Sequence, residues 1–169
     1  ALKIYKNLVA SDPSNNVWKR DWSYAQAQLA YLLIIQKQPV PASKLLDEAA
    51  IRLNPLLADS DAPVEWRRLS VMIALRRAQA TLLTETLPAA RMQIDQVVLQ
   101  VRKLQGLSPK DTDTLELVSR VLITQGEVLA APGQRSAALD VWREARDLLL
   151  PLESNSFERR VLQPWIAVN

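Results

Sequence analysis

The 169-residue chain contains no cysteine and no histidine. Without thiols it can form neither a disulfide nor a cysteine nucleophile, and without imidazole it lacks the commonest general base and a frequent metal ligand. Only three glycines occur, too few for a β-rich protein with many tight turns. The longest apolar run covers residues 29–35, far too short to cross a bilayer. We therefore expect no enzyme, no cofactor, no metal and no membrane insertion within these residues.

The residues that are abundant favour helices. Leu, Ala, Gln, Glu and Arg dominate, and all are good helix formers. A hydrophobic content of 49% and a charged content of 23% are ordinary for a globular protein. The net charge of +3 is mildly basic, so it is compatible with an acidic partner without requiring one.

Small and apolar residues recur every 48 residues along the chain. Four rows of positions keep their character through three periods: Ala30, Ala78 and Gly126; Leu46, Ile94 and Trp142; Ala49, Val97 and Ala145; Leu53, Val101 and Leu149. A fixed period of this length is typical of repeat proteins built from helix pairs.

Within this period, three- and four-residue spacing of apolar side chains predicts about eight helices and no strand. The predicted helices cover residues 1–10, 16–36 and 42–54, then a stretch ending near 85, residues 88–106, 109–130, a segment closed by Pro151, and a last segment capped by residues 154–156. Because short turns make neighbouring helices antiparallel, the fold class predicted is all-α, with a right-handed α-solenoid of helix pairs.

Particular residues set the expected helix ends. We expect Ser14 or Asn15 to cap one helix and Pro41 to occupy the first position of the next. We expect Gly106 to end a helix in a left-handed conformation, and Ser108 with Pro109 to start the following one.

The spacing inside each period resembles the tetratricopeptide repeat. The first unit reads Ala30, Ala42, Leu46, Ala49 and Pro55; the second reads Ala78, Ala90, Ile94 and Val97; the third reads Gly126, Ala138, Trp142, Ala145 and Pro151. The period is longer than in that family, and the extra length lies in extended helices. The resemblance implies one repeat domain over residues 1–169, divided into a truncated repeat (1–13), three repeats (15–58, 60–106 and 108–152) and a further truncated repeat (154–169).

A narrower resemblance covers the two ends. LKIYKNLV at residues 2–9 with DPSN at 12–15, and residues 137–152 followed by LQPW at 162–165, are similar to repeat regions of large bacterial signalling proteins. These include receptor-like Ser/Thr kinases and membrane-bound winged-helix regulators. The resemblance implies a larger parent protein with the array in the periplasm; the cytoplasm is the alternative.

Two charged clusters have a structural and a functional interpretation. Asp111, Asp113 and Glu116 could hold a metal, but without histidine or a glycine loop we expect them to complement the start of a helix. Four arginines at positions 67, 68, 76 and 77 could bind nucleic acid. We expect a solvated or partner-binding face instead, because the aromatic residues nearest in sequence position, Trp18, Trp22 and Trp66, fall on the packed face.

The five tryptophans have the same two interpretations. A ligand cage is possible, but tryptophan at helical spacing with leucine and alanine is more often core. We expect Trp18, Trp22 and Trp66 on the inward side, and Trp165 exposed. In the helix at 16–36 the inward stripe consists of Trp18, Trp22, Gln26, Leu29, Ala30 and Leu33.

If the resemblance holds, the first helix of each repeat lines a concave groove. The predicted groove residues are Arg20, Tyr24 and Tyr31 in the first repeat, Arg68, Met72 and Gln79 in the second, and Arg120 and Glu127 in the third, with Ala27, Ile34, Leu75, Leu82, Glu116, Ile123 and Ala130 along the same stripes. This mixture suits a peptide or helix that carries apolar side chains and an acidic group. The alternative is that the tyrosines cover packing between repeats.

The sequence therefore predicts a non-catalytic scaffold for protein–protein interaction, within a larger bacterial signalling or regulatory protein. A self-association module, and hence a homo-oligomer, is the alternative. Nucleic acid is not an expected partner.

Overall fold

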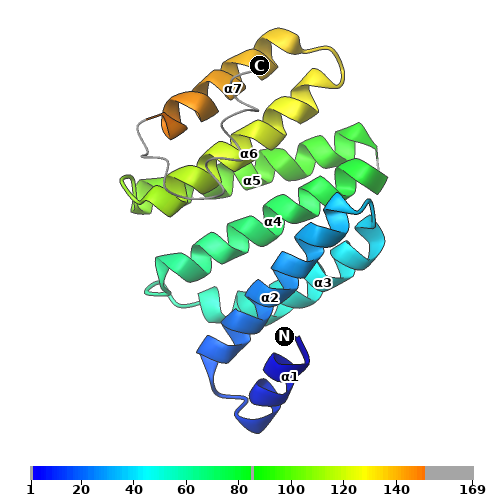
Figure 1. Ribbon diagram of the computed structural model, residues 1–169. Helices are drawn as coiled ribbons and strands as arrows, with labels where there is room; N and C mark the ends of the chain where they lie inside the picture. The colour runs from blue at the N-terminus through cyan, green and yellow to red at the C-terminus, as the bar shows by residue number, and fades with distance from the viewer. Residues whose placement is uncertain (1, 85, 151–169) are drawn as a thin grey trace. The chain divides into compact units, whose positions relative to one another are not determined.

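The computed structural model describes residues 2–84 and 86–150, and in these residues the chain is all-α, without a strand. Figure 1 shows the helices in order: α1 (Leu2–Ser11), α2 (Asn16–Ile35), α3 (Pro39–Leu53), the 3₁₀ helix η1 (Asn54–Leu57), α4 (Val64–Thr84), α5 (Leu87–Leu107), α6 (Thr112–Ala130) and α7 (Arg135–Leu149). The predicted all-α class is confirmed. The predicted helix beyond residue 154, together with Pro151 and Trp165, lies outside the described residues.

The chain divides into two compact units, Ala1–Thr86 and Leu87–Asn169. The first unit contains α1 to α4, and the described part of the second contains α5 to α7. Each unit has its own packed helices and is described by itself below.

In the first unit, α3 packs against both α2 and α4, and α1 packs against α2. Small residues let these helices approach closely, because alanine adds little bulk at the contact. The buried cluster consists of Ala27, Ala30, Ala42, Leu46, Ala49, Leu53, Leu69 and Ile73. The hydroxyl of Ser23, also fully buried, donates to the carbonyl of Ala49 at 3.2 Å and ties α2 to α3.

In the second unit, α6 packs against both α5 and α7, which is why it carries more buried residues than either neighbour. The closest approach on α6 is at Gly126, where the indole of Trp142 lies against the helix backbone. A Cβ atom at Gly126 would overlap that ring. The Trp142 Nε1 donates to the carbonyl of Ile123 at 3.2 Å, which fixes the ring in this place.

Burial follows the 48-residue period read from the sequence. The small-residue row at positions 30, 78 and 126 is buried throughout, and so are the rows beginning at Ala49 and Leu53. In the row of large residues, Leu46 and Ile94 are buried, while the larger Trp142 is half-buried.

The turn after α2 and the turn after α6 share one backbone geometry, two periods apart. Lys37 has φ 58°, and the next residue, Gln38, donates from its backbone N–H to Leu33 at 2.8 Å. Gly133 has φ 87°, and Gln134 donates to Leu129 at 3.1 Å. This is a left-handed helix end of the Schellman type. Glycine adopts it freely, whereas Lys37 must hold a conformation that side chains disfavour.

Three predicted helix ends are wrong. Helix α3 begins at Pro39 and not at Pro41, because the first turn leaves its N–H groups unpaired and so accommodates both prolines. Gly106 lies inside α5 and is not left-handed. Helix α6 begins at Thr112 and not at Pro109.

The start of α6 is set by Asp111. Its carboxylate accepts from the backbone N–H of Thr114 at 2.9 Å and from the hydroxyl of the same residue at 2.5 Å. This side-chain cap outweighs the Ser108–Pro109 signal. Of the two predicted caps of α2, Asn15 is the one that the structure shows, since its side chain accepts from the N–H of Trp18 at 3.1 Å.

Candidate functional site

Helix α2 presents a stripe of exposed apolar and aromatic side chains. Val17, Tyr24, Tyr31 and Ile35 follow one another at helical spacing and are between 40% and 56% exposed. Tyr24 and Tyr31 were predicted as groove residues, whereas the sequence interpretation omitted Val17 and Ile35. We call these four residues the α2 stripe.

Four residues predicted to share the groove-lining stripes are buried instead. Ala27 belongs to the core of the first unit, since this side of α2 faces the neighbouring helices. Leu75 is also buried. Glu116 and Ile123 are buried on α6, which is covered by helices on two sides. On α2 the two predicted tyrosines are exposed, and so are Leu29 and Leu32, which lie outside the predicted groove stripe.

Arg76 on α4 reaches α2 directly behind this stripe. It is only 5% exposed, and its guanidinium donates to the carbonyl of Ala27 and, at 3.2 Å, to the side-chain oxygen of Gln28. The same guanidinium lies 4.8 Å from the ring centroid of Tyr31. The prediction that Arg76 belongs to a solvated or partner-binding face is wrong, because the side chain is buried. Its role is to join α4 to α2 and to hold the ring of Tyr31 by a cation–π contact.

Two other arginines of the predicted basic cluster also have local partners. Arg67 donates to three carbonyls of the preceding turn, at 2.7 to 3.1 Å. Arg77 pairs with Asp47 on α3 at 2.8 Å. Arg68 is half-buried. The cluster thus contributes to the packing of α4 through Arg67, Arg76 and Arg77.

The remaining predicted groove residues are spread over both units. Arg20 pairs with Asp21 at 2.9 Å beside the α2 stripe. Met72 packs against the core of the first unit, and Gln79 is half-buried. Arg120 and Glu127 lie on α6 in the second unit. They are therefore not placed relative to the tyrosines.

Glu127 combines an exposed side chain with a carboxyl group that is partly shielded from water. This desolvation raises the pKa of the Glu127 carboxyl above its ordinary value of 4.5.

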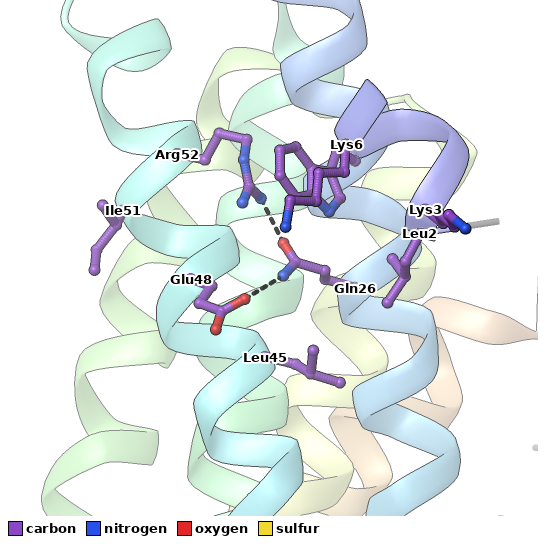
Figure 2. A pocket seen from close by; sticks show the side chains of 9 residues that line it. Leu2, Lys3, Lys6, Gln26, Leu45, Glu48, Ile51 and Arg52 are labelled. Carbon is purple, nitrogen blue, oxygen red and sulfur yellow. Dashed lines mark hydrogen bonds between the residues drawn. The ribbon is translucent and has the colours of Figure 1, made fainter. Parts of the chain in front are cut away.

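A surface pocket of about 600 Å³ lies among α1, α2 and α3 (Figure 2). Its lining consists of Leu2, Lys3 and Lys6 from α1, Trp22 and Gln26 from α2, and Leu45, Glu48, Ile51 and Arg52 from α3. The sequence interpretation placed Trp22 and Gln26 on the inward stripe of α2 and did not foresee this pocket.

At the centre of the pocket, three side chains are held by one another. Gln26, only 2% exposed, donates to the Glu48 carboxylate at 2.8 Å and accepts a hydrogen bond from the Arg52 guanidinium. The guanidinium of Arg52 lies 3.6 Å from the ring centroid of Trp22. Burial lowers the pKa of Arg52, and the neighbouring Glu48 partly offsets this effect. The one sequence signal for this arrangement was a glutamine on an otherwise apolar stripe.

Among the described residues, no group of three or more acidic side chains gathers in a way that could hold a metal ion. Asp111 caps α6 and Asp113 lies in its first turn, whereas Glu116 is buried further along the helix. Within residues 2–84 and 86–150, no helix combines the length and the apolar character needed to cross a membrane.

Comparison with protein-family models, with curated proteins and with solved structures finds no match for this chain.

Proposed function

We propose that the protein is a non-catalytic scaffold that binds a peptide or a helix of a partner protein on the α2 stripe. The observation that carries this proposal is the row of four exposed apolar side chains on α2, with Tyr31 held from behind by Arg76. Exposed large apolar side chains that follow one helix face are a feature of interaction surfaces.

The two tyrosines suit such a role because each offers a large apolar ring and a polar hydroxyl. A ring that is already fixed loses little conformational entropy on binding, and the cation–π contact with Arg76 fixes Tyr31 in this way. Arg20 lies on the same helix and is partly exposed, so an acidic group on the partner would be favoured there.

We further propose that the helices pair antiparallel and stack as a right-handed tetratricopeptide-like solenoid within a larger bacterial signalling or regulatory protein. The 48-residue pattern of burial supports this architecture, as does the left-handed turn shared by Lys37 and Gly133. In such an array the first helix of each pair lines the binding surface.

The test begins with a photo-crosslinking amino acid at Tyr24, which identifies the partner segment in cells. The synthetic segment is then titrated against Tyr24→Ala and Tyr31→Ala. We expect each variant to lose at least about tenfold in affinity, since truncated aromatic anchors typically cost more than about 1.4 kcal/mol. Leu99→Ala, which truncates an exposed leucine on α5, is the matched control and should bind normally.

Unchanged affinity in both tyrosine variants would remove the α2 stripe as the binding surface. Crosslinks to a second copy of the chain, together with a dimer in sedimentation that Tyr24→Ala dissociates, would instead favour the self-association function.

A further inference from the structure

The Gln26–Arg52 pair of the α1–α2–α3 pocket has no counterpart at the matching positions of the other two repeats, although Glu48 returns as Gln96 and Glu144. The three positions read Trp22, Gln26 and Arg52 in the first repeat, Ser70, Ala74 and Gln100 in the second, and Val118, Leu122 and Leu148 in the third. In the second unit, α6 packs against α7, and these two helices carry the last of the three sets, which is wholly apolar. A helix pair of this kind therefore forms without the polar group.

Gln26 is nearly buried and the Arg52 guanidinium is partly buried, so both lose hydration on folding. This desolvation costs free energy that an apolar side chain at the same position would not cost. Gln26 and Arg52 link α2 to α3 by a hydrogen bond, but the packing of such a helix pair does not require them. A ligand in the adjoining pocket would give them a further use.

The chemistry of the pocket wall indicates the kind of ligand. Lys3, Lys6 and Arg52 carry positive charge, and the one carboxylate of the lining, Glu48, already accepts a hydrogen bond from Gln26. Figure 2 shows the side chains of Arg52 and Gln26 pointing toward one another, with Lys6 of α1 beside them. Leucine, isoleucine and tryptophan side chains form the rest of the wall. The pocket therefore offers an excess of positive charge next to apolar surface.

We propose that this pocket binds an acidic peptide segment, with a carboxylate at Arg52 and Lys6 and a neighbouring large apolar side chain against Trp22 and Leu45. Arginine is suited to a carboxylate because its planar N–H groups match the two oxygens. Here the guanidinium is already oriented by Trp22 and Gln26, so little of its freedom remains to be lost. A volume of about 600 Å³ holds a few side chains and is within the usual range for ligand pockets.

This site is separate from the α2 stripe. Tyr24 is two residues from both Trp22 and Gln26, which corresponds to about 200° of rotation around the helix. The two surfaces can therefore be tested independently of each other.

The experiment is a selection of phage-displayed random heptapeptides on the 169-residue chain, with counter-selection on Arg52→Leu. Leucine is the residue of the third repeat at this position, so the variant should keep its fold. The enriched peptides are synthesised and titrated against Lys6→Glu, which changes an exposed side chain, and against Arg52→Gln. We expect enrichment of glutamate or aspartate next to a large apolar residue, and a loss of at least tenfold in affinity in each variant. Tyr24→Ala should bind these peptides normally.

Three outcomes would overturn the proposal. The first is that no peptide is enriched over the counter-selection. The second is that the enriched peptides lack carboxylates or lose binding with Tyr24→Ala but not with Arg52→Gln, which would assign them to the α2 stripe. The third is that inorganic phosphate displaces the peptides completely at equal concentration, which would show that the pocket recognises an anion alone.

Discussion

The contact between Gly126 and Trp142 gives the sharpest prediction about stability. A methyl group at Gly126 would lie closer than 3.0 Å to the indole, so Gly126→Ala must displace the ring. Overpacking of this kind costs about 1–3 kcal/mol. Displacement also weakens the hydrogen bond from the indole to Ile123, which adds about 1 kcal/mol. Alanine gains about 1 kcal/mol over glycine inside a helix. The net expectation is a loss of about 1–3 kcal/mol.

The residues two 48-residue periods earlier suggest how to reverse this loss. There the same two positions hold Ala30 and Leu46, both fully buried. Trp142→Leu alone should destabilise the second unit, because it leaves space above the glycine. The double variant Gly126→Ala with Trp142→Leu recreates the pairing of Ala30 with Leu46. It should be more stable than the sum of the single effects predicts, by about 1–2 kcal/mol.

The assay is urea unfolding followed by circular dichroism at 222 nm. Gly106→Ala is the matched control: it makes the same substitution inside α5, where a new Cβ meets no atom within 4 Å. It should leave stability unchanged or raise it by up to about 1 kcal/mol. If Gly126→Ala is stabilised as much as Gly106→Ala, the indole does not occupy the space above Gly126. Strictly additive effects in the double variant would also refute the reasoning.

Three further substitutions test other features. Lys37→Gly relieves the left-handed lysine and should raise the free energy of unfolding by about 0.5–1 kcal/mol in the same assay, whereas Gly133→Ala should lower it by a similar amount. Asp111→Ala removes the cap of α6 and should cost about 0.5–2 kcal/mol, while Asp111→Asn should retain most of it. Desolvation raises the pKa of Glu127 in the folded state, so its contribution to stability falls as the pH rises through the unfolded and then the folded pKa. Glu127→Gln should therefore raise the melting temperature at pH 7 and not at pH 3, and equal effects at both values would contradict the shift.

The all-α class and the buried rows could be predicted because both depend on short-range spacing. Apolar residues spaced three or four positions apart lie on the same side of a helix. The 48-residue period then predicts the same buried side in the later helices. Helix ends were less predictable where two signals competed. Asp111 prevailed over Ser108 as the cap of α6 because its carboxylate reaches two donors of Thr114.

The contacts of Arg76 and of the pocket could not be predicted, because they join residues on different helices. Arg76 meets Ala27 from a position 49 residues away, and Arg52 meets Gln26 from a position 26 residues away. A hydrophobicity pattern identifies the inward side of a helix, but it does not show which polar group will find a partner there. The sequence alone therefore could not show that Arg52 and Arg76 each connect two helices.

These residues also show how departures from a repeat can be interpreted. The pair Gly126 and Trp142 replaces the pair Ala30 and Leu46 of the first unit. The larger tryptophan faces the smaller glycine, so the two changes offset each other in volume and preserve the packing. Gln26 with Arg52 departs from the apolar residues two periods later, Leu122 with Leu148, and puts a hydrogen-bonded polar pair where apolar side chains also pack. Where buried positions otherwise keep their character every 48 residues, we interpret a departure that conserves volume as structural, and a polar departure that packing does not require as a sign of binding. On this criterion the pocket of the first unit, and not the tight contact of the second, is where a ligand should be sought.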